Sequence, residues 1–248
     1  HKAKHRIFEG VGAIVVNAED PLSSPLVPDQ TPRVQFSVQA PDFHRFGVLV
    51  HGDRDWIALG MEPWIPVDEL PYQGRHMLQN VMAACAIAHL LGIDASACRV
   101  AATQFKGLPH RMAECQTVHG VRFVNDSKGT NVGASQTAME SIGQAGRLFL
   151  LAGGDSKGAD LMQWGQAARR NCAGVFAFGR DARRFQAAVG DLARTFETLD
   201  QAFQAAVAEA EAGDVILLSP AAASFDQFAN YQARGRHFEA LVEALYEV

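Results

Sequence analysis

Charged and polar side chains gather in a short segment that follows an apolar run. Residues 125–131 read NDSKGTN and place Asp126 and Lys128 two positions apart. Such charges cost free energy of desolvation if they are buried and contribute little if they are exposed. A turn that enters a helix needs only a capping residue, which Thr130 or Asn131 supplies. The charges therefore favour a functional site and a solvated turn about equally.

A second segment, GGDSKGAD at 153–160, also precedes an expected helix. The first backbone N–H groups of a helix can meet an anion. The segment is not a P-loop, because the pattern G-x-x-x-x-G-K-[ST] occurs nowhere in the chain. A glycine-rich turn that leaves Lys157 in solvent explains the segment equally well.

A third segment, SPAAASFDQF at 219–228, combines small residues with polar ones. Small side chains let a backbone or a ligand approach closely. Ser224 is expected to cap a last helix over 225–245, with Gln227 at the capping-box position. For this segment taken alone, capping is favoured over ligand binding.

A fourth segment, GLPHRM at 107–112, carries His110 and Arg111. Arginine binds phosphate in a bidentate manner, and an ion pair between domains is the alternative role. Asn80 lies inside an expected helix, where asparagine is mildly unfavourable, and solvent exposure would also explain it.

Alternating strands and helices are expected to position these segments. The alternation in the second half predicts a mostly parallel, doubly wound α/β sheet with helices on both faces. Ligands of such sheets bind beyond the carboxyl ends of the strands, where three of the segments lie. The expected strands are 121–125, 147–152, 174–178, 194–198 and 214–218, and the expected helices are 131–142, 160–170, 181–189, 199–211 and 225–245.

The first third of the chain is expected to be rich in strands. The apolar run at 11–20 is typical of a buried parallel strand, and the alternation within 33–38 and 46–59 predicts an antiparallel or edge portion with short turns. A helix is expected over 74–93 and a second over 95–105, and the boundary between two domains is expected at 107–109. The apolar stripe of the first of these helices is expected to be Met77, Val81, Ala84, Cys85 and Ala88.

Composition excludes several classes of protein. The net charge of −5 argues against a nucleic-acid partner held by phosphate attraction. No apolar run approaches the roughly 20 residues that a membrane helix needs, and no secretory signal is visible, so a cytoplasmic protein without a membrane partner is expected. The four scattered cysteines are expected to be reduced and mostly buried.

Taken together and in this order, the four segments resemble the Mur ligases. The similarity runs from AKHRIFE at 3–9 to the final helix, and it is closest to the member that adds D-glutamate to UDP-N-acetylmuramoyl-L-alanine. It implies that 1–108 is the last part of a central ATP-binding α/β domain and that 109–248 is a complete Rossmann-like C-terminal domain. The uridine-binding domain and the P-loop of the family have no counterpart in this sequence, so the chain alone is expected to be inactive.

The resemblance also implies roles for single residues, with ATP as co-substrate and Mg²⁺ as cofactor. ATP would phosphorylate the carboxylate of UDP-N-acetylmuramoyl-L-alanine, and the amine of D-glutamate would attack the acyl phosphate. These small molecules are the expected partners of a monomer. The resemblance assigns nucleotide binding to Asn80, Arg111, Asp126 and Lys128, catalysis to Arg111 and Lys128, D-glutamate binding to Thr130, Lys157, Ser224, Phe225 and Tyr231, and the metal to Lys4 after carbamylation.

Two alternatives stay open. One is a glutamate ligase like the folylpolyglutamate synthases, which share this architecture, although segments 125–131 and 219–228 favour the D-glutamate enzyme. The other is a non-catalytic nucleotide-binding module. No G-x-G-x-x-G follows the expected strand at 121–125, which gives little support to dinucleotide binding.

Overall fold

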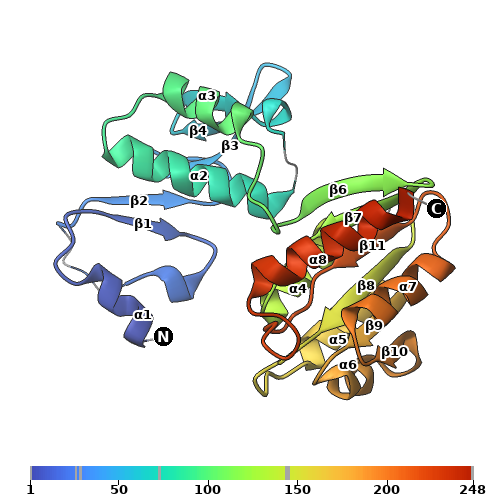
Figure 1. Ribbon diagram of the computed structural model, residues 1–248. Helices are drawn as coiled ribbons and strands as arrows, with labels where there is room; N and C mark the ends of the chain where they lie inside the picture. Colours follow the sequence, from blue (N-terminus) through green and yellow to red (C-terminus); the bar gives the residue numbers. More distant parts are fainter. Residues whose placement is uncertain (1, 26, 28–29, 72–73, 143–145, 247–248) are drawn as a thin grey trace. The chain divides into compact units, whose positions relative to one another are not determined.

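A computed structural model describes residues 2–25, 27, 30–71, 74–142 and 146–246 (Figure 1). The chain divides into two compact units, His1–Lys106 and Gly107–Val248, two residues before the boundary expected from the sequence. Within the described residues, no helix combines the length and the apolar character needed to cross a membrane.

The first unit is built on a five-stranded sheet in the order β1-β2-β3-β4-β5. The first three strands run parallel and the last three antiparallel, which confirms the parallel strand expected within 11–20 and the antiparallel pairing expected within 46–59. The prediction for 33–38 was wrong, because β2 pairs in parallel with both β1 and β3, and alternation reports a partly exposed strand without fixing its direction. Helices α2 and α3 cover a core that includes Phe46, Ile57 and Ile65. The elements are α1 (Lys2–His5), β1 (Ile14–Asn17), β2 (Arg33–Phe36), β3 (Arg45–His51), β4 (Arg54–Leu59), β5 (Glu62–Pro66), α2 (Arg75–Leu90) and α3 (Ala95–Gln104).

Helix α2 turns part of the expected apolar stripe toward the core. Its buried residues are Met82, Cys85 and Ala86, and Val81 and Ala88 of the stripe pack partly buried against the same core. Met77, Val81, Ala84 and Ala88 also line a cavity of about 400 Å³ together with α3 residues and Phe105. The stripe is therefore divided between the core and this cavity.

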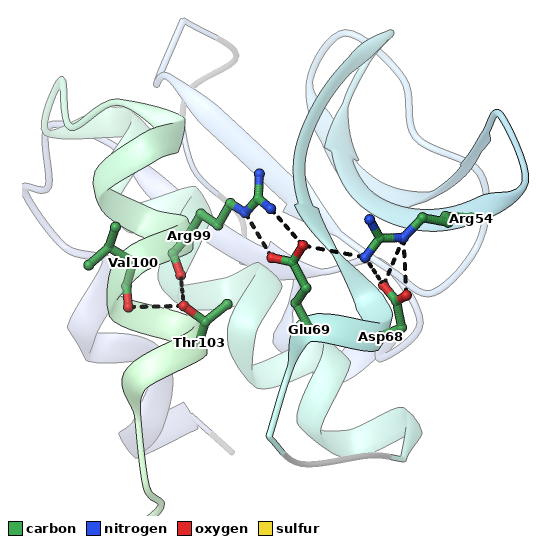
Figure 2. Close-up of polar contacts among 6 residues, drawn as sticks. All are labelled: Arg54, Asp68, Glu69, Arg99, Val100 and Thr103. Carbon is green, nitrogen blue, oxygen red and sulfur yellow. Dashed lines mark hydrogen bonds and ion pairs between the residues drawn. The ribbon is translucent and has the colours of Figure 1, made fainter.

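A charged network joins β4, the turn Val67–Glu69 and α3 in the first unit (Figure 2). Arg54 Nε donates to both carboxylate oxygens of Asp68, at 3.0 and 3.2 Å, and Arg54 Nη2 also donates to Glu69. Arg99 donates to the same Glu69 from Nε and Nη2, at 2.9 and 2.6 Å. Exposed pairs of this kind contribute little stability singly, so the network fixes the geometry of this corner more than it holds the fold.

The second unit is built on a six-stranded sheet in the order β10-β9-β8-β11-β7-β6, and all pairs except β6 with β7 are parallel. All five predicted strands are present, within two residues at each end. The antiparallel β6 was not predicted, because its residues alternate between half-buried and exposed and form no apolar run. The strands are β6 (Ala113–Val118), β7 (Val121–Asn125), β8 (Leu148–Gly153), β9 (Gly174–Phe178), β10 (Ala193–Phe196) and β11 (Val215–Leu218).

Helices cover both faces of this sheet, as the alternation predicts (Figure 1). One face packs against α4, α5 and α6, where Trp164 meets Phe185 edge to face at 4.9 Å between ring centroids. The other face packs against α7 and α8 through Phe123, Phe203 and Phe238. The helices are α4 (Val132–Ser141), α5 (Met162–Asn171), α6 (Ala182–Val189), α7 (Leu199–Glu209) and α8 (Tyr231–Glu243).

The strand order creates a topological switch point beside β11. This strand lies between β7 and β8, whose connections lead to α4 and α5 on one face, whereas the chain leaves β11 for α8 on the opposite face. A crevice opens where neighbouring parallel strands connect to opposite faces, and ligands bind there. Segments 125–131, 153–160 and 219–228 follow these three strands, so the fold brings them to one place.

The start of the last helix differs from the prediction. Helix α8 begins at Tyr231 instead of 225, and its cap is Asn230, whose side chain accepts from the N–H of Ala233 at 2.8 Å. The expectation that Ser224 caps this helix is therefore wrong. The carbonyl of Ser224 instead accepts from the N–H groups of Gln227 and Phe228 in a turn. At the other expected cap, Asn131 caps α4 as proposed.

Candidate active-site edge of the second unit

Arg234 joins two of the loops from inside the protein. It is fully buried in the first turn of α8. Its Nε donates to Ser127 Oγ at 3.0 Å and its Nη2 to the Ser127 carbonyl at 2.9 Å, while both Nη atoms donate to the Ala222 carbonyl at 3.2 Å. Burial lowers the pKa of Arg234 to about 10, against the opposing charges of Asp226 and Asp126, so the group stays charged at neutral pH.

Asp126 makes a second connection between the same loops. Its Oδ2 accepts from Ser219 Oγ at 2.7 Å and its Oδ1 from the N–H of Met112 at 3.3 Å. Gly129 is required beside it, because a Cβ there would lie 2.4 Å from Asp126 Oδ2. Burial raises the pKa of Asp126 to about 6, and the hydrogen bonds and the charges of nearby arginines oppose that rise.

His110 anchors segment 107–112 beneath the loops. Its backbone has a φ of 63°, which non-glycine residues rarely adopt, and its side chain is buried. Its Nδ1 lies 2.9 Å from Asn125 Nδ2, which also donates to the Gly235 carbonyl and to Glu239. The His110 carbonyl accepts from the N–H of Lys128 at 2.9 Å. Residues from β7, α8 and the start of the unit thus hold the backbone of Lys128.

Lys128 and Arg111 present their charges differently. The ammonium group of Lys128 lies 4.7 Å from the centroid of the Tyr231 ring. No carboxylate of the described residues lies within ion-pair distance of it. Arg111 is exposed, and its backbone N–H donates to the carbonyl of Leu108. Both cations are therefore available to an anion, as a phosphate site requires.

The loop after β8 is tied to the loop after β11. Asp155 and Ala223 exchange two backbone hydrogen bonds of 2.9 Å, and Gly154 allows this approach because a Cβ there would lie 2.2 Å from the Ala223 carbonyl. Lys157 is exposed, with a φ of 51°, and its N–H donates to Asp155 Oδ1. Asp155 also pairs with Arg180 at 2.8 Å. The exposed Lys157 thus stands on a fixed loop.

The remaining predicted residues differ in their exposure, and two of them lie in the first unit. Thr130 is half-buried at the start of α4, Ser224 is buried in the loop after β11, and Phe225 beside it is exposed. Asn80 lies exposed on α2 and Lys4 on α1, both in the first unit. Among the residues that the structure describes, no group of three or more histidine, cysteine or acidic side chains could hold a metal ion. The four cysteines are free, and Cys85 and Cys98 are buried.

The sequence analysis did not identify Arg234, Asn125 and Ser219, whose buried contacts hold the loops at this edge of the sheet. A signal for Arg234 was present, because it shares one helical face with Phe238 and Val242, and a charge within an apolar stripe requires buried partners. Asn125 and Ser219 carried no such signal, since their partners lie 110 and 93 positions away in the sequence.

The sequence of the chain is similar to those of known ligases. Residues 110–222 match the family model described as "Mur ligase, glutamate ligase domain". The chain is 41% identical over 249 residues to the UDP-N-acetylmuramoylalanine–D-glutamate ligase of Pseudomonas aeruginosa, covering 99% of this chain and 56% of that protein. The chain therefore spans about half the length of the curated relatives that it matches.

Solved structures share the fold at low sequence identity. A pseudomurein peptide ligase type C from Methanothermus fervidus has a TM-score of 0.75 and 15% identity, over 98% of this chain and 59% of that one. A bifunctional folylpolyglutamate synthase/dihydrofolate synthase from Yersinia pestis has a TM-score of 0.61 and 15% identity, over 87% of this chain and 48% of that one. The family model over residues 110–222, the sequence identity along nearly the whole chain and the shared fold agree that this chain is similar to the Mur ligases.

Proposed function

We propose that the natural protein containing this chain is an ATP-dependent ligase that adds D-glutamate to UDP-N-acetylmuramoyl-L-alanine in peptidoglycan synthesis. The observation that carries the proposal is the 41% identity to the Pseudomonas aeruginosa D-glutamate ligase over 99% of the chain. The clustering of the three loops at the switch point supports it, because this is where a ligand of such a sheet binds.

Phosphoryl transfer would use two cations of the second unit, Arg111 and Lys128. The reaction needs mainly the positioning of phosphate groups and the neutralisation of their charge. Arg111 is exposed and Lys128 has no carboxylate partner among the described residues, so both can meet the ATP phosphates and the acyl phosphate. Asn80 on α2 is proposed to contact adenine.

Asp126 is proposed to contact the nucleotide while it holds the loops together. A carboxylate offers about four lone-pair sites. Ser219 and Met112 use two of these in the structure, so further sites on the same oxygens can accept from the nucleotide.

D-glutamate brings two carboxylates, which need cations and hydrogen-bond donors once water is excluded. Lys157 supplies an exposed ammonium group on a loop fixed by Asp155. Thr130 and Ser224 supply hydroxyl groups. Phe225 follows Ser224 directly, and Tyr231 is the first residue of α8. Both would line the part of the site that holds the side chain of D-glutamate.

Magnesium is proposed as the cofactor, with Lys4 as a ligand after carbamylation. A carbamate replaces the ammonium charge with oxygen atoms, which suit a hard cation such as Mg²⁺. The metal would neutralise charge on the ATP phosphates. We further propose a cytoplasmic monomer. The chain by itself has no G-x-x-x-x-G-K-[ST] pattern, so we expect no ATP turnover from it alone.

Amide formation by the natural protein tests this function. The purified protein would be given ATP and Mg²⁺ with either UDP-N-acetylmuramoyl-L-alanine and D-glutamate, or a folate and L-glutamate. We expect a product of the mass of the D-glutamate amide from the first pair only. Product from the folate pair alone would favour the second candidate, whose fold the chain shares. Nucleotide binding without product from either pair would indicate a binding module.

A further inference from the structure

Lys128 is held by an aromatic ring instead of a carboxylate. Its ammonium nitrogen lies 4.7 Å from the centroid of Tyr231. The negative face of an aromatic ring attracts a cation within about 6 Å of its centroid. This attraction leaves the charge of the lysine in place, whereas an acidic partner would neutralise it and compete with an incoming anion.

The backbone of Tyr231 is held by the loop that carries Lys128. Tyr231 is the first residue of α8, and its carbonyl accepts from Ser127 Oγ at 2.8 Å. Ser127 is fully buried and is held in turn by Arg234. The ring also meets His110 edge to face, with 6.3 Å between the centroids. Lys128 and the Tyr231 ring are therefore linked by one network of contacts.

We propose that Tyr231 is a positioning residue whose ring holds the Lys128 ammonium group ready for the phosphate. This inference rests on the proposed function and adds to the carboxylate contact suggested for Tyr231. A free lysine side chain loses substantial rotamer entropy when it binds an anion. A ring that restricts the side chain beforehand lowers this cost and leaves its N–H donors available.

The contact with the ring face, and not the phenol hydroxyl, is what the proposal requires. Tyr231→Phe keeps the face, while Tyr231→Leu removes it and retains a shorter apolar side chain. Where Tyr231→Leu fails to fold, pentafluorophenylalanine at position 231 keeps the shape of the ring and removes its attraction for cations. The proposal predicts that wild type and Tyr231→Phe keep the contact with Lys128 and that the other two variants lose it.

A magnetic-resonance experiment on the full chain tests the contact without any enzymatic activity. The sequence has five lysines, so labelling with ¹³C-lysine gives few signals, and Lys128→Arg identifies the one of interest. Protons above a ring face are shifted upfield by its ring current. We expect this shift for the Lys128 ε-methylene group in wild type and Tyr231→Phe, and its loss in Tyr231→Leu. An unshifted Lys128 signal in the wild type would overturn the proposal.

Kinetics of the natural protein test the positioning role. We expect Tyr231→Leu to lower kcat/KM for ATP by about two- to thirty-fold relative to Tyr231→Phe, the range of a cation–π contact. Equal rates for the Leu and Phe variants would overturn the role, even with the contact visible by magnetic resonance. A wild-type protein with no ligation at all would instead refute the proposed function and leave the measured contact intact.

Discussion

Replacing Asp126 by asparagine should make the second unit more stable at neutral pH. The carboxylate is buried and carries a charge that burial disfavours. Asparagine has nearly the same shape and no charge. Its oxygen can accept from the N–H of Met112, and its amide can donate to Ser219 Oγ, so both contacts of Asp126 have a counterpart in the variant.

The size of the effect follows from the pKa of Asp126. Burial raises it from 3.8 to about 6, and the hydrogen bonds from Ser219 and Met112 and the charges of Arg111 and Arg234 oppose that rise only in part. Because the folded chain holds the proton more tightly than the unfolded chain, the contribution of Asp126 to the free energy of unfolding is lost as the pH rises from about 4 to about 6. The loss amounts to roughly 3 kcal/mol above about pH 7.

Urea unfolding between pH 5 and 8 measures this contribution. Trp164 is the only tryptophan of the second unit, and the other two are Trp56 and Trp64. In a Trp56→Phe, Trp64→Phe background, fluorescence therefore reports the second unit alone, which avoids treating two units as one transition. We expect the free energy of unfolding of Asp126→Asn to exceed that of the parent by about 1 to 2 kcal/mol at pH 5 and by about 3 kcal/mol at pH 8.

Asp214 provides the matched control because its environment lowers the pKa of the carboxyl group, whereas that of Asp126 raises it. Burial alone would raise the pKa of Asp214, but hydrogen bonds from the Arg147 side chain and from the backbone of Glu211 and Arg147 outweigh it and lower the pKa. Stability from this group is present above its unfolded pKa and is lost as the pH falls, so Asp214→Asn should destabilise the unit at neutral pH. A difference between Asp126→Asn and its parent that does not change with pH would refute the reasoning.

Two further substitutions test other contacts. Gly235→Ala should destabilise the second unit by about 2 kcal/mol in the same Trp164 assay, because the new Cβ would lie 2.3 Å from His110 Nδ1; a neutral effect would mean that His110 moves freely. Lys157→Met should raise the KM for D-glutamate by about ten- to a hundred-fold, the value of a charged hydrogen bond, with the KM for ATP unchanged. An equal rise in both KM values would show that Lys157 does not act on the amino acid alone.

The parallel sheet of the second unit was predictable because its pattern is local. Apolar runs of four to six residues alternate with amphipathic stretches, and caps such as Asn131 stand at helix starts. The start of α8 was not predictable in the same way. Ser224 and Asn230 are both good capping residues, and the choice between them depends on the turn that buries the loop after β11.

The charged residues of the loops were named from the sequence, but most of the buried residues that hold the loops in place were not. Lys128 and Lys157 stand out as charges next to glycine at strand ends. Asn125, Ser219 and Arg234 act through contacts between segments about a hundred positions apart, and a single sequence contains no record of such pairs. Strain at His110, with its positive φ, is likewise set by tertiary packing.

Oxygen transfer from substrate to phosphate tests the central claim most directly. The natural protein would be given ATP, Mg²⁺, D-glutamate and UDP-N-acetylmuramoyl-L-alanine labelled with ¹⁸O in its terminal carboxylate. An acyl phosphate that is attacked by the amine leaves one carboxylate oxygen on the phosphate. The account predicts one ¹⁸O atom in each phosphate released, in step with amide formation. Release of unlabelled phosphate together with the amide would contradict it.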